Sequence, residues 1–179
     1  MKGISINRIS VIGTSCSGKS TFSDRLSCVL GIPHIEMDTL HWGADWTTKE
    51  DFLDQIRDTV RDENWIIDGN YREAAGIILP RATTVIFLNL PFTTVFFRAL
   101  NRTTKRILSG EEFHNGNRET FRGAFLSTKG IPLWVIRTYR RRKKHFAEMK
   151  ERPEYLHIEY VELFSVEDID KFIEKIRSM

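Results

Sequence analysis

A glycine-rich octapeptide near the start of the chain limits the possible folds more than any other feature. Residues 13–20 read Gly-Thr-Ser-Cys-Ser-Gly-Lys-Ser and match the phosphate-binding pattern Gly-x-x-x-x-Gly-Lys-Ser/Thr at every fixed position. An apolar segment, residues 6–12, precedes the octapeptide, and apolar residues at helical spacing follow it over residues 20–30. The pattern requires a strand, a glycine loop and a helix in this order. A plain glycine turn is the competing interpretation, and Lys19 and Ser20 in register after Gly18 argue against it.

The chemistry of this loop favours a nucleoside triphosphate. Glycine at positions 13 and 18 allows the loop N–H groups to converge on phosphate oxygens at the positive end of the next helix. Lys19 would reach the β- and γ-phosphates, and the Ser20 hydroxyl would take one Mg²⁺ position. We expect ATP and Mg²⁺ as cofactors, with ATP preferred because the chain lacks the guanine-binding pattern Asn-Lys-x-Asp. The expected nucleotide-binding residues of the loop are Gly13, Ser15, Cys16, Ser17, Gly18, Lys19, Ser20 and Thr21.

Length and composition are those of one ordinary globular domain. The chain has 179 residues, 41% hydrophobic and 28% charged, so we expect residues 1–179 to form a single domain with a sizeable core. No apolar run approaches the roughly 20 residues of a membrane-spanning helix. Cys16 and Cys28 lack metal-ligand spacing, and the first residues lead directly into a strand. These features predict a cytoplasmic protein without a membrane partner.

Strand-like and helix-like segments alternate along the chain. Strands are expected at residues 6–12, 34–37, 65–68, 83–90 and 155–160, and helices at 20–30, 47 or 48 to 61, 73–79, 92–108, 131–150 and 166–176. Apolar strands that alternate with helices are typical of a parallel sheet covered on both faces. Right-handed crossovers would place the phosphate-binding loop at the carboxyl edge of that sheet. The predicted fold class is α/β, a P-loop NTPase with a parallel five-stranded sheet and helices on both faces.

Residues 109–128 differ in character from the segments around them. Three glycines and two asparagines interrupt this stretch, and charged residues and phenylalanines are mixed among them. We therefore expect a mobile lid within the domain. Basic residues also concentrate in this part of the chain, because residues 98–150 carry 14 Lys and Arg against four Asp and Glu, whereas the whole chain has a net charge of only +3. Such a segment indicates an anionic partner.

A second phosphate-site signature ends the third expected strand. Asp68 follows three apolar residues, and a carboxylate at this position would hold Mg²⁺ through a water molecule. The segment Asp-Gly-Asn-Tyr-Arg at residues 68–72 resembles the Asp-Gly-Phe-Pro-Arg stretch of adenylate kinases. Arg98 and Arg102, seven and eleven residues after Pro91, match arginines of that family, one beside the adenine and one on the phosphates. The resemblance implies a nucleoside monophosphate kinase-like fold, with metal at Ser20 and Asp68 and with Arg98 at the nucleotide.

A closer resemblance covers nearly the whole chain. It rests on the glycine loop with Lys19, Met-Asp-Thr-Leu-His-Trp at residues 37–42, Trp-Ile-Ile-Asp-Gly-Asn-Tyr at 65–71, Ile-Phe-Leu-Asn-Leu-Pro at 86–91 and the basic helix. In these features the chain is similar to the family of DNA topology modulation proteins. That family is grouped with kinases related to adenylate kinase, so the resemblance implies a P-loop kinase fold and nucleotide binding. It does not identify a phosphoryl acceptor.

Asp38 is the main candidate on the acceptor side, and we expect it at the end of the second strand. The matching region of adenylate kinases helps to bind AMP and has an arginine soon after, whereas residues 37–46 contain no Arg or Lys. Asp38 instead resembles the strand-two carboxylate of shikimate and gluconate kinases. A carboxylate there can orient an attacking hydroxyl or accept its proton. We therefore expect a hydroxyl acceptor, and a turn or helix-capping aspartate is the competing interpretation.

Aromatic residues follow Asp38 within a short stretch. His41, Trp42 and Trp46 could form a wall for a flat or sugar-like substrate. They could equally pack a short loop onto the core. The sequence leaves both interpretations open, and His41 is not predicted to be catalytic.

Basic residues of the later helices complete the expected site. Arg98, Arg102 and Arg106 are four residues apart and share one helical face. Arg137, Arg141 and Lys144 share a face of the basic helix, in the place of the arginines that follow the lid in adenylate kinases. Phosphoryl transfer depends on positioned charges of this kind. The expected catalytic residues are Lys19, Asp38, Arg72, Arg102, Arg137 and Arg141.

Two functions fit these features. The first is an ATP-dependent phosphotransferase related to adenylate kinases. It would act on a small molecule or nucleotide whose accepting group is unidentified and is expected to be a hydroxyl. The alternative is a nucleotide-binding regulator that hydrolyses ATP slowly and contacts DNA through the basic segment. Nucleic acid is the less favoured partner because the chain shows no helix-turn-helix pair, zinc module or aromatic sheet motif. The sequence leaves the oligomeric state open.

Overall fold

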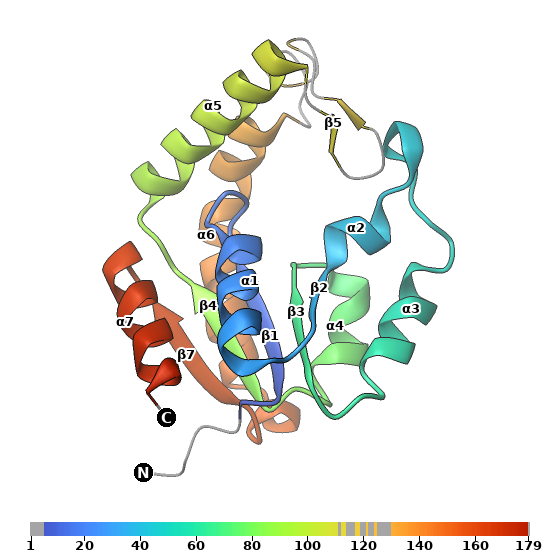
Figure 1. Cartoon of the computed structure of the whole chain (residues 1–179), viewed down its shortest axis with the longest axis vertical. Coiled ribbons are helices and arrows are strands. Elements are labelled where there is room, and N and C mark those ends of the chain that lie inside the picture. The colour runs from blue at the N-terminus through green and yellow to red at the C-terminus, as the bar shows by residue number, and fades with distance from the viewer. Residues whose placement is uncertain are drawn as a thin grey trace.

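A five-stranded parallel sheet forms the centre of the molecule (Figure 1). The computed structural model describes residues 6–110, 112–113, 117–118, 121, 124 and 130–178. Every pairing within this sheet is parallel, which confirms the predicted α/β fold class. The strands, in their spatial order, are β2 (His34–Glu36), β3 (Trp65–Asp68), β1 (Arg8–Gly13), β4 (Thr84–Leu88) and β7 (Glu159–Leu163).

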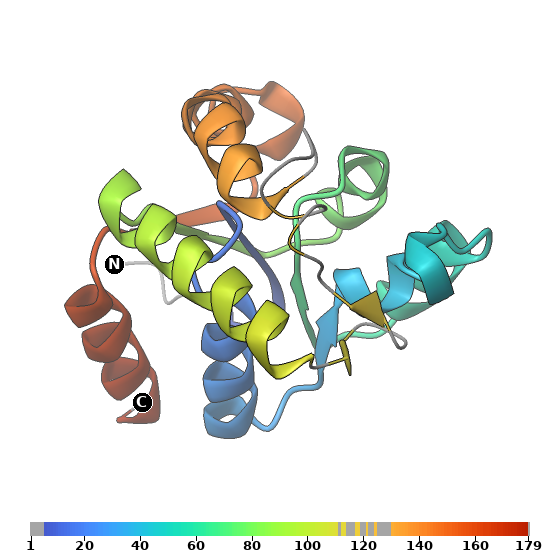
Figure 2. The ribbon, with the colours of Figure 1, turned by 90° about the horizontal axis from the view of Figure 1, so that it is seen from above.

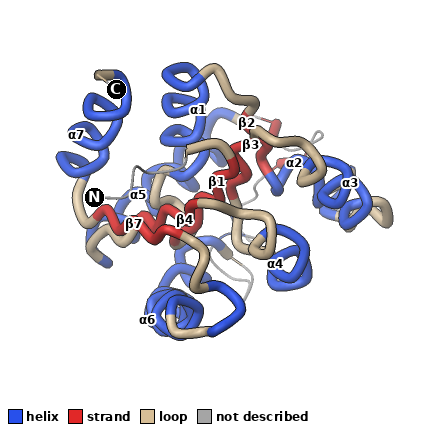
Figure 3. Tube along the Cα trace, turned by 90° about the horizontal axis from the view of Figure 1, so that it is seen from below, coloured by secondary structure: helices blue, strands red, loops and turns tan. Residues whose placement is uncertain are grey.

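Helices cover both faces of the sheet. Figure 3 shows α1 (Lys19–Leu30) and α7 (Val166–Arg177) on one side of the row of strands, with α4 (Arg72–Ile78) and α6 (Ile131–Lys150) on the other. Seen from above, α5 (Phe92–Ser109) crosses in front of the sheet (Figure 2) and packs against α6. The short elements α2 (Met37–His41) and η1 (Ala44–Trp46), with α3 (Phe52–Thr59), lie beyond the β2 edge.

Alternate strand residues supply a hydrophobic core on each face of the sheet, because successive side chains of a strand point to opposite faces. Trp65, Ile66 and Ile67 of β3 are all fully buried, as expected for a strand covered on both sides. One core joins Ile9, Val11, Ile66, Ile86 and Leu88 of the strands to Phe22, Leu26, Phe172 and Ile173 of α1 and α7. The other joins Trp65, Ile67, Val85 and Phe87 to Ile56 of α3 and Phe146 and Met149 of α6.

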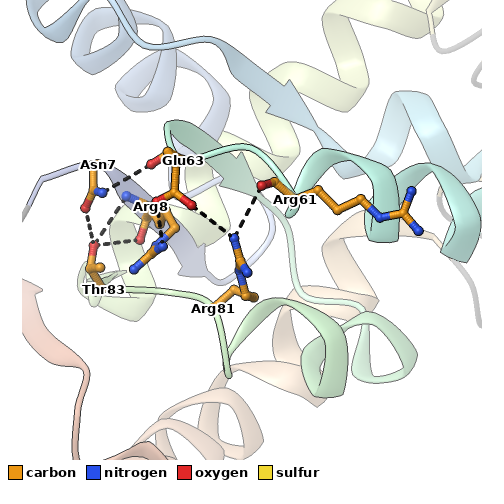
Figure 4. Close-up of polar contacts among 6 residues, drawn as sticks. All are labelled: Asn7, Arg8, Arg61, Glu63, Arg81 and Thr83. Atoms are coloured by element: carbon orange, nitrogen blue, oxygen red, sulfur yellow. Dashed lines mark hydrogen bonds and ion pairs between the residues drawn. The ribbon is translucent and has the colours of Figure 1, made fainter.

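Polar side chains hold the strands together at the amino end of the sheet (Figure 4). Glu63 pairs with Arg8 at 3.0 Å and with Arg81 at 3.5 Å, and its carbonyl oxygen accepts a hydrogen bond from the Asn7 side chain at 3.1 Å. The Thr83 hydroxyl lies 3.1 Å from Asn7 Oδ1 and accepts from the Arg8 backbone N–H at 3.3 Å. This network lies at the edge opposite the phosphate-binding loop. We assign this network a structural role, which is to align β1 with the segments that precede β3 and β4.

Three differences from the predicted elements stand out among smaller shifts at other element ends. The last strand begins at Glu159 rather than at 155, because Pro153–Tyr155 forms the short helix η3 with proline in its first turn. The second strand ends at Glu36, and the following five residues form α2, which was not predicted. The third helix begins at Phe52, after Asp51, instead of at 47 or 48.

Only part of the predicted lid, residues 109–128, can be compared with the structure. Within it, β5 (Glu112–Phe113) pairs antiparallel with β6 (Asn117–Arg118). Residues 111, 114–116, 119–120, 122–123 and 125–128 lie outside the described residues. The movement of this segment stays a prediction, as does the single domain. Across the described ranges, no helix has both the length and the apolar character needed to span a membrane.

Candidate active site

The phosphate-binding loop connects β1 to α1 at the carboxyl edge of the sheet. Gly18 precedes α1 with a φ of 93°, a left-handed conformation that glycine adopts without strain. Gly13 is closely packed, because a Cβ atom there would lie 2.7 Å from Ser17 Oγ and 3.0 Å from the Leu88 carbonyl oxygen. The Ser17 N–H donates to the Thr14 carbonyl at 3.1 Å and closes the loop on itself. Ser17 Oγ is buried without a hydrogen-bond partner among the described residues.

Lys19 is the first residue of α1 and folds back over this loop. Its Nζ atom donates to the Thr14 carbonyl oxygen at 3.4 Å. Burial lowers the pKa of Lys19 below its ordinary 10.5, while the charges of Asp68 and Asp38 act in the opposite direction. Both predicted carboxylates are therefore close enough to act on the Lys19 ammonium group. A bound phosphate would add a further negative charge and favour the charged form of the lysine.

Two carboxylates end neighbouring strands beside Ser20. Glu36 and Asp68 are register partners on β2 and β3. The Ser20 hydroxyl donates to Glu36 Oε1 at 2.9 Å, and the Thr39 hydroxyl donates to Glu36 Oε2 at 3.3 Å. Asp68 is only 2% exposed, and its Oδ2 atom has no hydrogen-bond partner in the described part of the chain.

These oxygens fit the requirements of Mg²⁺. The ion prefers oxygen ligands, keeps several waters, and binds proteins through one or two carboxylates together with substrate phosphates. Ser20 supplies a hydroxyl, and the orphaned Asp68 oxygen can accept from a metal-bound water. Among the described residues there is no cluster of three His, Cys, Asp or Glu side chains arranged to hold a metal ion by itself.

His34 connects the buried Asp68 with the surface. Its Nδ1 atom lies 2.6 Å from Asp24 Oδ1 on α1, and its Nε2 atom lies 3.7 Å from Asp68 Oδ1. Burial lowers the pKa of His34, but hydrogen bonds and charges from Asp68 and Asp24 outweigh burial and raise it above the ordinary 6.5. The imidazole is thus held between two carboxylates, one exposed and one inside the site.

Asn70 ties the phosphate-binding loop to α6. Its Oδ1 atom accepts from the Gly13 N–H at 3.2 Å, and its Nδ2 atom donates to the Gly13 carbonyl at 2.5 Å. On the other side, Arg142 donates from Nη1 to the Asn70 carbonyl at 3.0 Å. Burial lowers the pKa of Arg142, the nearby Arg141 lowers it further, and Asp38 raises it. Arg142 therefore contacts Asn70 directly, and the charge of Asp38 acts on its guanidinium.

Asp38 lies in the first turn of α2, just beyond the end of β2 where it was expected. No side chain caps α2, so the helix-capping interpretation of Asp38 does not apply. Its Oδ1 atom instead accepts a hydrogen bond from the Tyr71 hydroxyl at 2.6 Å. Burial, followed by the charge of Asp38, raises the pKa of Tyr71 above its ordinary 10.0, so Tyr71 remains a hydrogen-bond donor at neutral pH.

An aromatic cluster surrounds Tyr71. His41 is 8% exposed and stacks on Tyr71, with ring centroids 4.3 Å apart. It also meets the edges of Trp42 at 4.5 Å and Phe52 at 4.9 Å. Trp46 extends the cluster from Trp42 at 5.6 Å and is 42% exposed. His41 is therefore a packing residue, and a substrate-facing role for the two tryptophans stays a prediction.

The arginines predicted from the adenylate kinase pattern differ in their surroundings. Arg98 on α5 donates from Nη1 to the Ser17 carbonyl of the phosphate-binding loop at 3.2 Å. Arg102, one turn later, is half-buried, and its Nε atom has no partner within the described residues. Arg72 is exposed at the start of α4. Only Arg98 of these three directly contacts the loop in this structure.

The basic residues of α6 point to several sides. Arg137 and Arg141 are exposed, and the Arg141 guanidinium lies 6.0 Å from the centre of the Trp134 ring. Arg142 is the α6 arginine that contacts the loop region, through Asn70. Neighbouring helical residues point about 100° apart, so adjacent arginines reach different surroundings. Catalytic roles for Arg137 and Arg141 stay predictions.

Sequence reasoning missed five residues of this site, and the sequence offered at most a weak signal for them. Glu36 stands two residues before Asp38, a spacing of carboxylates that could have drawn notice. In the adenylate kinase-like segment, Asn70 and Tyr71 stand in place of Phe-Pro. That replacement was the available signal for these two residues, which follow the third strand. The missed residues are His34, Glu36, Asn70, Tyr71 and Arg142.

Comparison with known proteins places the fold but not the family. No protein-family model matches the chain, and no curated protein does either. Solved structures do match. A shikimate kinase from Aquifex aeolicus has a TM-score of 0.53 and 19% identity, covering 94% of this chain and 92% of that chain. A gluconokinase from Sinorhizobium meliloti has a TM-score of 0.55 and 14% identity, covering 97% and 90%.

A third structure, a shikimate kinase from Bacteroides thetaiotaomicron, has a TM-score of 0.56 and 15% identity, covering 96% of this chain and 97% of that chain. At these identities the likeness establishes a P-loop kinase fold. The resemblance to DNA topology modulation proteins stays a prediction.

Proposed function

We propose that this protein transfers the γ-phosphoryl group of Mg·ATP to a hydroxyl group of a small molecule. One observation carries the proposal: a half-buried carboxylate, Asp38, follows β2 at the carboxyl edge of the sheet and is held there by a 2.6 Å hydrogen bond from Tyr71, and its charge acts on the phosphate-loop lysine. A phosphate-binding loop alone is compatible with many nucleotide-binding functions. A carboxylate beside its lysine adds a group that can orient an attacking hydroxyl.

The donor side is formed by the loop and by α5. When bound, Mg·ATP supplies the transferable phosphoryl group and the metal charge that balances it. The loop N–H groups bind the phosphates at the start of α1, and Lys19 neutralises their charge. Ser20 and, through water, Asp68 hold the metal position. Arg98, which contacts the loop at Ser17, is placed to bind the nucleotide.

The acceptor side is formed by Asp38 and its neighbours. Asp38 orients the acceptor hydroxyl and accepts its proton. The acceptor oxygen bonds to the γ-phosphorus while the bond from that phosphorus to the β–γ bridging oxygen breaks. Arg142, which lies near Asp38, adds positive charge on the side of the transferring group, together with Arg72 and Arg102.

The structural likenesses support a hydroxyl acceptor over a phosphate acceptor. Their names state that the matching proteins phosphorylate shikimate or gluconate. The segment 37–46 also contains no Arg or Lys to bind a phosphate-bearing acceptor. Both the likenesses and the lack of basic residues in this segment fit a kinase that is related to adenylate kinases but specific for a hydroxyl acceptor.

The test is transfer of labelled γ-phosphate from Mg·ATP to a panel of nucleosides, nucleoside monophosphates and small hydroxylated metabolites, with water as the blank. Label on a hydroxyl compound supports the proposal and names the substrate class. Label on a monophosphate would retain the kinase and overturn the hydroxyl acceptor. Asp38→Asn should lower hydroxyl transfer by about 100-fold or more if the carboxylate accepts the proton.

Label found only in free phosphate, or not transferred at all, would instead favour the nucleotide-binding regulator. The next measurement would then be DNA binding as a function of salt concentration. Binding through phosphate contacts weakens steeply as salt rises. A DNA affinity that does not change with salt would argue against contact through the basic segment.

A further inference from the structure

The short segment between β3 and α4 contacts three parts of the candidate site. Asn70 hydrogen-bonds the Gly13 backbone of the phosphate-binding loop through both ends of its amide. Its carbonyl oxygen accepts from Arg142 of α6 at 3.0 Å. The next residue, Tyr71, donates to Asp38 on the acceptor side at 2.6 Å. One backbone segment therefore fixes the phosphate-binding loop relative to Asp38.

The Tyr71 ring is held on more than one side. It stacks on His41 at 4.3 Å with an interplanar angle of 30°, and it meets the edge of Phe52 at 5.2 Å. A ring locked by such contacts has little freedom to move its hydroxyl. The Tyr71 oxygen is therefore a fixed point, and a hydrogen bond from it restrains whatever accepts the bond.

The residue restrained in this way is Asp38. It belongs to a helix of only five residues that no side chain caps, so its own element gives it little support. Tyr71 holds Oδ1, and no other side chain among the described residues hydrogen-bonds Asp38. The Oδ2 atom is thus available to accept a further hydrogen bond. The Tyr71 proton stays in place at neutral pH, because burial and the Asp38 charge raise the pKa of the phenol.

We propose that Tyr71 is a positioning residue that orients Asp38, so that Oδ2 meets the acceptor hydroxyl while Oδ1 is held by the phenol. The inference rests on the proposed function, because it assigns Tyr71 a part in acceptor phosphorylation. It separates two tasks within one segment. Asn70 maintains the phosphate-binding loop, and Tyr71 maintains the acceptor carboxylate.

Tyr71→Phe tests this role, because it keeps the ring and removes only the hydroxyl. We expect kcat for the acceptor to fall by about 10- to 100-fold, as displacement of a reacting group by about 1 Å can cost this much. The KM for ATP should stay within about 2-fold of the wild type, since the variant leaves Lys19 and the loop in place. A structural defect would instead change both parameters together.

Tyr160→Phe is the matched control. Its hydroxyl hydrogen-bonds backbone carbonyls of Tyr155 at 3.3 Å and Met149 at 3.5 Å, in the core on the α6 face of the sheet. The variant therefore loses the same atom from a part of the molecule without site residues. Its kinetic parameters should equal those of the wild type. Equal losses in Tyr160→Phe and Tyr71→Phe would overturn the proposal.

A double-mutant cycle shows whether Tyr71 acts through Asp38. If it does, Tyr71→Phe should cost less than about 2-fold in the Asp38→Asn background, because coupled residues are not additive. An undiminished loss in that background would overturn the positioning role. If wild-type protein phosphorylates no acceptor, the proposed function fails, and this role fails with it. If wild-type turnover survives Tyr71→Phe, this role alone fails.

The hydrogen bond itself can be tested without turnover. In protein labelled with ¹³C at the tyrosine phenol carbon, the Tyr71 signal is the one lost in Tyr71→Phe. In Asp38→Asn the chemical shift of that signal at neutral pH should change, because the phenol then no longer donates to a charged carboxylate. An unchanged signal would show that Tyr71 and Asp38 are not paired in solution and would overturn the proposal.

Discussion

At the residue scale, Gly13 and Gly76 differ sharply in the space around their Cβ positions. The Cβ position of Gly13 is already crowded by Ser17 Oγ at 2.7 Å and by the Leu88 carbonyl oxygen at 3.0 Å. The carbonyl belongs to the neighbouring strand and cannot move without disturbing the sheet. Gly76, in the middle of α4, has no atom within 4 Å of its Cβ position. The same substitution should therefore have opposite effects at the two positions.

Gly13→Ala should destabilise the protein by about 1–3 kcal/mol through overpacking. It should also lower the affinity for an ATP analogue, because the loop must shift to accept the methyl group. Gly76→Ala should raise the free energy of unfolding by roughly 0.5–1 kcal/mol and leave binding unchanged. Urea denaturation and fluorescence titration measure both quantities. Equal effects in the two variants would contradict the packing described around Gly13.

His34 should make stability depend on pH. Its pKa is raised above the ordinary 6.5 by Asp68 and Asp24, so the native state binds a proton that the unfolded chain releases more easily. The contribution of His34 to the free energy of unfolding is therefore fully present below pH 6.5. It is lost as the pH rises through the pKa that His34 has in the native state. The difference in unfolding free energy between wild type and His34→Asn should shrink as pH increases above 6.5.

The exposed His157 supplies the control for this measurement. His157→Asn should change the free energy of unfolding only slightly, because the side chain is exposed. A difference for His34→Asn that does not change with pH would mean that the imidazole is not charged between the two carboxylates.

At the scale of elements, α6 shows how one helix separates similar residues. Arg142 is half-buried beside Asn70, whereas Arg141 is exposed over the Trp134 ring. We expect Arg142→Ala to slow phosphoryl transfer by about 10-fold or more, because a positioned arginine stabilises charge on the transferring group. Arg141→Ala should stay within about 3-fold of the wild-type rate.

Steady-state kinetics with the acceptor that the labelled-phosphate assay finds decides between the two arginines. The sequence pattern favoured Arg141, because it shares a helical face with Arg137 and Lys144. A larger loss in Arg141→Ala than in Arg142→Ala would support the sequence prediction and would mean that α6 turns when nucleotide binds. Circular dichroism of both variants checks that the helix is retained.

Local signals explain which elements could be predicted. The glycine loop, the apolar strands and the helix periodicities depend on residues adjacent in the chain, and the structure contains them. The helix α2 was missed because it has only five residues, too few for a periodic pattern. The last strand was placed too early because Tyr155 reads as a strand former, whereas Pro153 begins a short helix there.

At the scale of the whole molecule, the site could be predicted only where its residues carry a motif. Lys19, Ser20 and Asp68 were predicted in this way, and their roles stay predictions. The Tyr71–Asp38 contact joins residues 33 positions apart, and the Arg142–Asn70 contact joins residues 72 positions apart. Such pairs depend on how the strands are ordered in the sheet, which no short segment encodes. The residues that link the two halves of the site were therefore missed.

Nucleotide binding should stabilise the whole fold by mass action. At a concentration of about 100 times Kd, Mg·ATP should add about 2.7 kcal/mol. For a chain of this size that should raise the Tm by roughly 5 to 10 °C. Differential scanning fluorimetry measures the shift. Lys19→Ala should lose most of it, and Lys171→Ala, which removes an exposed partner of Glu167 on α7, should keep it.

The order of the strands has a consequence for synthesis on the ribosome. The first two strands made, β1 and β2, are not neighbours, because β3 lies between them. β1 gains its second partner only with β4, which begins at Thr84. Until β4 emerges, one edge of the apolar strand β1 therefore has no partner, and unpaired strand edges are prone to aggregate. A chain arrested before Thr84 should need a chaperone, whereas one that has passed Leu88 can close the sheet around β1.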